Sequence, residues 1–288
     1  ETTFGGLFET EANYRDPYVA ELIEDDGWML WPPVPFSYQT LDRDVQGPVP
    51  SPPGSRHWLG TDDQGRDVFS TILYGMRISL FVGVAAVAFA MVLGITLGLI
   101  SGYVGGWVET TIMRVADVQL TFPSILVAML IFGIAKGITP VEYRDQMAIW
   151  VLILAIGLSD WVQFARVVRG ATLVEKNKEY VQAARLIGRK PGAIMLRHIL
   201  PNVLSPVLVI ATISLALAII AEATLSFLGV GAPPTQPSLG TLIRIGQGFL
   251  FSGEWWILFF PACTLLALAL SVNLLGDWLR DALNPRLR

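Results

Sequence analysis

Long runs of uncharged apolar residues alternate with short polar segments along most of this chain. Residues 78–108, for example, contain no charged side chain. A helix of about 23 residues is roughly 35 Å long, which exceeds the ~30 Å hydrocarbon core of a bilayer. The pattern therefore predicts membrane-spanning helices. Five are expected, at residues 77–101, 107–137, 147–165, 203–228 and 255–275.

Individual residues within these runs predict how the helices pack. Gly94, Gly98 and Gly102 recur at every fourth position, a spacing that lets a second helix approach closely. Pro123 lies inside the second span, where the missing N–H predicts a kink. Asp160 and Gln163 are expected near the end of the third span, close to the membrane interface.

The segment 179–202 interrupts the apolar pattern. It places apolar and small residues at helical spacing among basic residues, with a break at Gly188. We expect a helix up to this glycine, which permits a sharp reversal, and a second short helix that ends at Pro201. Ala183 and Ala184 would give the first helix a smooth surface that fits a groove. The segment is too polar to span a bilayer and too regular for a loop, so it predicts a docking element for a soluble partner.

Residues 1–76 differ from the remaining membrane domain, 77–288. They contain 13 acidic and 4 basic side chains and many prolines, which exclude a regular helix or a central strand. The aromatic content favours an irregular lobe over a disordered linker. The GTDDQGRD run, residues 60–67, lacks the spacing of a calcium loop and is interpreted as a polar turn.

Composition and charge support an all-α polytopic membrane protein. The chain is 53% hydrophobic and 15% charged, against about 25% charged residues in soluble domains. Eight Lys and Arg residues lie between positions 166 and 197, but only one lies in the loop 229–254. The positive-inside rule places segment 166–202 and the C-terminus in the cytoplasm, with residues 1–76 and 229–254 outside. A lobe outside at the start of the chain predicts a further anchor upstream of residue 1.

No catalytic, cofactor-binding or metal site is expected in this chain. The sequence has no phosphate-binding P-loop, so the chain should not hydrolyse ATP itself. Its two histidines, His57 and His198, are predicted on opposite sides of the membrane. Cys263 is the only cysteine, which excludes an intrachain disulfide and a cysteine-based metal site.

The segment EYVQAARLIG, followed by RHILPN, resembles the cytoplasmic "EAA" signature of binding-protein-dependent ABC importer permeases. The runs GWVETTIMRVADVQLTFPS, WVQFARVVRG, EATLSFLGVG and NLLGDWLRDALNP extend the resemblance to the oligopeptide/dipeptide permease family, over residues 58–285. The acidic lobe is similar to the subgroup associated with oligopeptides and microcin C-type peptides. One departure is Gln182, where the signature has Glu. The family also has a span before the lobe, which would make six.

The resemblance implies a non-catalytic permease subunit of an ATP-driven peptide importer in the bacterial inner membrane. Its partners would be a second related permease, two cytosolic ATP-binding cassette ATPases carrying ATP and Mg, an extracytoplasmic solute-binding protein, the peptide and membrane lipid, but no nucleic acid. The residues expected to couple to the ATPases are Glu179, Tyr180, Gln182, Ala183, Ala184, Gly188, His198 and Pro201.

Glu222 lies late in the fourth span and has two interpretations. A carboxylate within the membrane costs about 2.5–3.5 kcal/mol on insertion scales, so it should face the protein interior. It could contact a peptide amine on the transport path, or it could join helices by pairing with Ser, Thr or backbone groups. We favour the second interpretation.

Two other classes of membrane protein share this composition. A secondary transporter driven by an ion gradient needs ionisable residues at mid-span and repeated halves; only Glu222 qualifies, and no repeat is evident. A non-transporting receptor or scaffold would co-purify with an ATPase without substrate-stimulated hydrolysis. Dependence of transport on ATP separates the importer from the ion-driven transporter.

Overall fold

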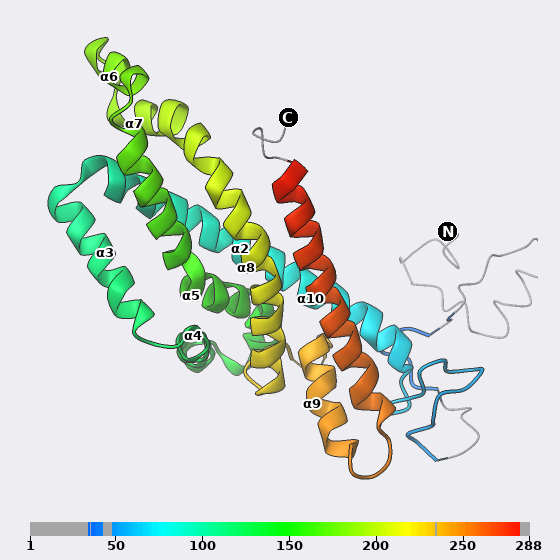
Figure 1. The fold of residues 1–288 in the computed structure, drawn as a ribbon. Coiled ribbons are helices and arrows are strands. Elements are labelled where there is room, and N and C mark those ends of the chain that lie inside the picture. The colour runs from blue at the N-terminus through cyan, green and yellow to red at the C-terminus, as the bar shows by residue number, and fades with distance from the viewer. Residues whose placement is uncertain (1–33, 35, 43–47, 234, 283–288) are drawn as a thin grey trace, which may run out of the picture. The chain divides into compact units, whose positions relative to one another are not determined.

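The computed structural model describes residues 34, 36–42, 48–233 and 235–282. The chain divides into two units, Glu1–Phe36 and Ser37–Arg288. All described helices belong to the second unit, and the predictions for residues 1–33 lie outside the described residues. The helices are α2 (Val68–Val104), α3 (Gly106–Leu120), α4 (Ser124–Ile138), α5 (Arg144–Glu175), α6 (Glu179–Leu186), α7 (Pro191–Ile194), α8 (Leu200–Phe227), α9 (Leu239–Phe249) and α10 (Trp256–Ala282) (Figure 1).

The described part of the chain is all-α, as the apolar pattern predicts, and contains no strand. Four helical segments are long and apolar enough to cross a membrane: Val68–Val104, Val141–Glu175, Pro191–Phe227 and Trp256–Trp278. Helices α3 and α4 provide a fifth if they are counted together. The fold class is therefore confirmed, with differences in where the helices begin and bend.

Helix α2 begins at Val68, earlier than the predicted start at residue 77. Asp67 is the N-cap, and its side chain accepts a hydrogen bond of 2.8 Å from the backbone N–H of Ser70. Such a cap satisfies one of the free donors in the first helical turn. The hydroxyl of Thr71 donates to the carbonyl of Val68. The polar residues that marked this stretch as a lobe therefore start the helix.

The second predicted span is broken at Pro123 rather than kinked. Helix α3 ends at Leu120, and α4 starts after Pro123 at an angle of 97° to α3. The backbone at Pro123 has an extended ψ of 129°, so the chain leaves the helical path at this residue. The missing N–H of proline and its steric restriction on the preceding residue explain why the helix stops here.

Helices α2 and α5 pack closely through the three glycines. A Cβ atom at Gly98 would lie 2.6 Å from the carbonyl oxygen of Ala165, and one at Gly102 would lie 2.7 Å from Cβ of Thr172. Gly94 fits in the same way against Trp161 and Phe164. The predicted packing ridge is therefore confirmed, and its partner is α5.

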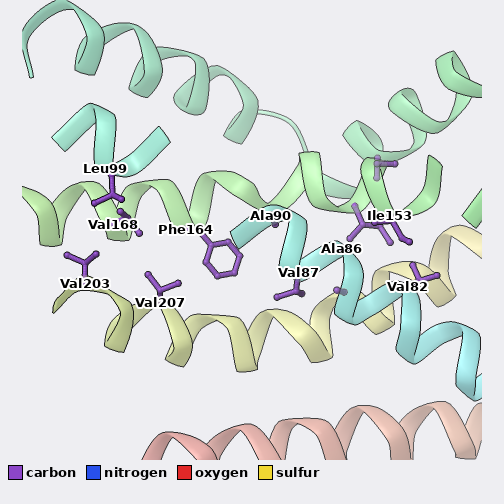
Figure 2. Close-up of a cluster of buried hydrophobic side chains, with 14 of the residues drawn as sticks. Val82, Ala86, Val87, Ala90, Leu99, Ile153, Phe164, Val168, Val203 and Val207 are labelled. Atoms are coloured by element: carbon purple, nitrogen blue, oxygen red, sulfur yellow. The ribbon is translucent and has the colours of Figure 1, made fainter. Parts of the chain in front are cut away.

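The main core fills the space beside this contact (Figure 2). Phe164 and Val168 of α5 face Val203 and Val207 of α8, and all four side chains are fully buried. A second cluster joins the start of α2 to α9 and the start of α10. Its buried members are Val68, Ile72, Leu239, Leu242, Trp256 and Ile257.

The loop before α2 is fixed to the ends of two helices. The GTDDQGRD run forms the predicted polar turn, in which Asp62 accepts hydrogen bonds from the backbone N–H groups of Gln64 and Arg66. The indole of Trp256 in α10 donates to the carbonyl of Thr61. The ring nitrogens of His57 lie 2.9 Å and 3.1 Å from carboxylate oxygens of Asp67 and Asp42. These contacts hold the loop on the bundle.

The glycine contact between α2 and α5 can be tested by substitution. Gly98→Leu places a side chain where even a Cβ is too close, so we expect a loss of about 1–3 kcal/mol in stability, as for other overpacked sites. Gly133→Ala in α4 is the control, because a Cβ there meets nothing within 4 Å. The measurement is the thermal unfolding midpoint of the purified protein in detergent. Equal midpoints for both variants would contradict the proposed contact.

Candidate functional site

The predicted docking segment forms a helical hairpin between α5 and α8. Helix α6 follows the end of α5 after a short turn, and α7 leads into α8 through one π-helical turn, Met195–Ile199. The hairpin lies at the opposite end of α8 from α9 (Figure 1). We call residues 176–202 the coupling hairpin.

Gly188 makes the reversal within the coupling hairpin. Its φ of +76° lies in the left-handed region that favours glycine. The N–H of Arg189 donates to the carbonyl of Ala184, and the N–H of Gly188 donates to that of Arg185. This pair of bonds is the Schellman ending of an α-helix. A Cβ at Gly188 would meet nothing within 4 Å, so glycine is needed for its backbone conformation and not for space.

Pro201 does not end a helix, contrary to the prediction. The helical path continues from Pro191 to Phe227, and Pro201 lies in the first turn of α8. The π-helical turn precedes it, with the N–H of Leu200 bonded to the carbonyl of Met195. Proline offers no N–H to the carbonyl four residues earlier, and a wider turn accommodates that loss. The helical path therefore continues from the coupling hairpin into α8 without a break.

The two faces of α6 have different surroundings. Val181 and Ala184 are buried and belong to the main core, together with Ile194 of α7 and Ile199 of the π-helical turn. The expectation that both alanines form an exposed surface is therefore wrong for Ala184, which faces the bundle. Ala183 is exposed as expected.

The tip of the coupling hairpin is apolar and exposed. Leu186 is 89% exposed and Ile187 is 74% exposed. Basic residues border them, namely Arg185, Arg189 and Lys190. Exposed apolar residues of this size with a polar border are typical of an interaction surface.

Tyr180 connects three helices. Its hydroxyl donates to the Glu175 carboxylate at the end of α5 and accepts a 3.1 Å hydrogen bond from Asn202 of α8. Burial, together with the hydrogen bond to Glu175, raises the pKa of Tyr180 to about 12. The phenol therefore keeps its proton at neutral pH and remains a donor. Tyr180 fixes α6 to both of the long helices beside it.

The remaining predicted residues lie around this contact. The Gln182 amide donates to the carbonyl of Asn177 in the turn before α6, a bond for which an ionised Glu would lack the donor. Glu179 is exposed in the first turn of α6, where an acidic side chain is favourable. The His198 carbonyl accepts from Asn202. The Asn202 amide thus joins Tyr180 to the backbone of His198, whereas Gln182 bonds to the turn before α6.

Two residues in these contacts were not predicted from the sequence. Asn202 and Glu175 position Tyr180. The helical spacing of His198 and Asn202 is the one signal that could have indicated a side-chain bond within RHILPN. At the same end of the bundle, the side chain of Lys176 donates a 2.8 Å hydrogen bond to the carbonyl of Gly102 and so joins the end of α5 to the end of α2.

Glu222 is fully buried and joins α8 to α2. Its carboxylate oxygens accept hydrogen bonds of 2.6 Å and 2.7 Å from the hydroxyls of Ser79 and Ser226. These hydroxyls in turn accept from the backbone N–H groups of Leu239 and Ala232. The geometry is that of the favoured interpretation, a carboxylate that joins helices through serines.

Asp160 lies at the middle of α5 and not near the end of a span. The prediction placed it near the end of a span because the apolar run ends at residue 165, but α5 continues to Glu175. Its closeness to the membrane interface stays a prediction. Within the described part of the chain, Asp160 is half-buried and makes no hydrogen bond or ion pair. Its surroundings therefore differ from those of Glu222.

Comparison with known proteins identifies the family of the chain. Residues 94–288 match the family described as "Binding-protein-dependent transport system inner membrane component". The chain is 40% identical to the oligopeptide transport system permease protein OppC of Bacillus subtilis, over 82% of this chain and 74% of that one. It is also 40% identical to the glutathione transport system permease protein GsiD of Pectobacterium atrosepticum, over 96% of this chain and 82% of that one.

A solved structure shares the fold. An inward-facing conformation of the MetNI methionine ABC transporter matches 75% of this chain and 97% of its own, with a TM-score of 0.57 and 20% identity. The apolar helices and the family match together make this a multi-pass inner membrane protein and a permease subunit of an ATP-driven importer. The chain belongs to the binding-protein-dependent transport system inner membrane components.

Proposed function

We propose that this chain is the permease subunit of an ATP-driven peptide importer. Relatives that share 40% identity over 82% of the chain include a putative peptide transport permease of Brucella suis and the OppC protein of Bacillus subtilis. The main support for this function is the coupling hairpin. Its apolar tip is exposed, and its inner face belongs to the main core. The chain itself is non-catalytic and binds no cofactor.

The proposal includes the orientation of the chain and its partners. The basic coupling hairpin and the C-terminus face the cytoplasm, and residues 1–76 and 229–254 face outward. A second, related permease completes the transport path. Two cytosolic ATPases hold ATP and Mg, and an external solute-binding protein delivers the peptide. Contact with the ATPases involves the exposed tip, Leu186 and Ile187, together with the exposed members of the predicted set, Glu179, Gln182 and Ala183.

Coupling would pass from the tip to the long helices as a rigid movement. Val181 and Ala184 anchor α6 in the core, and Tyr180 bonds it to α5 and α8. A partner that displaces the tip must therefore move these helices as well. Such movement between two arrangements of packed helices is how ligand binding is converted to a change of access.

The exposed tip gives the first test of coupling. We expect the double change Leu186→Ser and Ile187→Ser to lower ATP-driven uptake at least tenfold, which corresponds to about 1.4 kcal/mol or more of lost contact with the ATPases. Both side chains are exposed, so the fold should be unaffected. Uptake of tri-alanine into proteoliposomes holding the whole importer is measured with co-purification of the ATPases.

The matched control is Trp107→Ser, which removes an 80% exposed apolar side chain outside the hairpin. It should leave uptake and ATPase co-purification unchanged. Normal uptake by the double variant would contradict the coupling role of the tip. Failure of the unaltered importer to take up any peptide in the presence of ATP would instead contradict the proposed substrate.

Tyr180 gives the second test, because it is expected to keep α6 aligned with its neighbours. Tyr180→Phe removes the donor to Glu175 and the acceptor for Asn202, and each bond contributes about 1 kcal/mol. We expect faster hydrogen exchange of the α6 amides and lower uptake per ATP hydrolysed. Tyr143→Phe, at an exposed position outside the hairpin, is the control. Unchanged exchange in α6 would show that the hydroxyl does not fix the hairpin.

A further inference from the structure

Asp160 differs from Glu222 and from the two paired acidic residues of α3. Glu222 is bonded to two serines, and Glu109 and Asp117 of α3 pair with Arg169 and Arg166 of α5. The two arginines of α5 that follow Asp160 are thus occupied by α3. Among the described residues, no cation and no hydrogen-bond donor contacts the Asp160 carboxylate.

The depth of Asp160 follows from its neighbours on α2. The uncharged stretch of α2 and the following turn, residues 78–108, has its centre near Gly94. Gly94 packs against Trp161, and Gly157 packs against Phe89, so Asp160 lies between these two levels. It is on the order of 22–24 Å from either end of α5, at a rise of ~1.5 Å per residue. The carboxylate therefore lies beside the middle of the uncharged stretch of α2.

Asp160 begins a stripe along one face of α5 that the described chain covers only in part. The residues of the stripe recur at intervals of three and four, which places them on one helical face. They are Asp160, Gln163, Val167, Gly170 and Val174. Gln163 and Val174 are exposed, and a Cβ at Gly170 would meet nothing within 4 Å. Helices α2 and α3 cover other faces of α5.

A lipid environment does not suit this stripe. An aspartate facing hydrocarbon costs about 2.5–3.5 kcal/mol on insertion scales, and intramembrane carboxylates normally face a water-filled path or a paired group. Asp160 and Gln163 lie one turn apart, so two polar side chains share the same face. Water, or a ligand that passes through it, is the surrounding that satisfies both.

We propose that Asp160 lines the transport path and binds the positively charged amino group of a peptide in transit. This inference rests on the proposed peptide import. A free peptide carries a protonated α-amino group, whose pKa is about 7.7–8.0. A carboxylate without a cation of its own complements that charge, and an ammonium–carboxylate hydrogen bond is among the stronger kinds. Gln163 offers a donor and an acceptor to the adjacent peptide group.

Cysteine reactivity tests whether the stripe is in water. Gln163→Cys is made in an importer with Cys263→Ser and no other cysteine, and it is treated with a positively and a negatively charged thiosulfonate reagent. We expect reaction about tenfold faster with the cationic reagent, corresponding to about 1.4 kcal/mol, and protection by tri-alanine. The preference should disappear when Asp160→Asn is added. Leu154→Cys, exposed on another face of α5, should react with neither.

Uptake tests the role of the charge itself. In proteoliposomes with the whole importer, Asp160→Asn should lower tri-alanine uptake about tenfold, again about 1.4 kcal/mol, and Asp160→Glu should restore most of it. Asp145→Asn, at an exposed position in the first turn of α5, should have no effect.

Three results would overturn the inference. The first is a Gln163→Cys importer that reacts with neither reagent, and the second is full uptake by the Asp160→Asn importer. The third is loss of the partner permease when the Asp160→Asn importer is purified, which would assign the carboxylate to the subunit interface. An unaltered importer that transports no peptide contradicts the proposed function instead. In that case the charge preference at Gln163→Cys still reports whether Asp160 attracts cations in an aqueous path.

Discussion

The close contact between α2 and α5 determines where every functional candidate lies. Without side chains at Gly94, Gly98 and Gly102, the backbone of α5 approaches α2 directly, and close packing of this kind replaces the hydrophobic effect as the attraction between helices in a membrane. Helix α5 then carries the coupling hairpin at one end and Asp160 at its centre. A substitution that separates these two helices would therefore displace the coupling hairpin and Asp160 together.

The two carboxylates within the membrane show how surroundings assign different roles to similar groups. Glu222 is buried and accepts hydrogen bonds from two serines, which are themselves bonded to backbone N–H groups near α9. It is a structural joint between helices. Asp160 has no such partner among the described residues, and an unsatisfied charge that faces hydrocarbon is costly unless water or a ligand reaches it.

The coupling hairpin combines a rigid base with an exposed tip. Its inner residues are part of the main core, and Tyr180 bonds it to both neighbouring helices. Gly188 allows the chain to reverse so that Leu186 and Ile187 point away from the bundle. A force applied to the tip therefore reaches α5, which carries Asp160, and α8.

The sequence by itself determined the membrane class, the approximate spans, the glycine ridge and the hairpin, because each depends on local composition or spacing. It could not determine that α3 and α4 meet at 97°, that Ala184 faces inward or that α8 continues through Pro201. It also placed Asp160 near the end of its helix, because the apolar run ends at residue 165 whereas α5 continues to Glu175. These features depend on which residues from distant segments come into contact, and only the tertiary structure decides that.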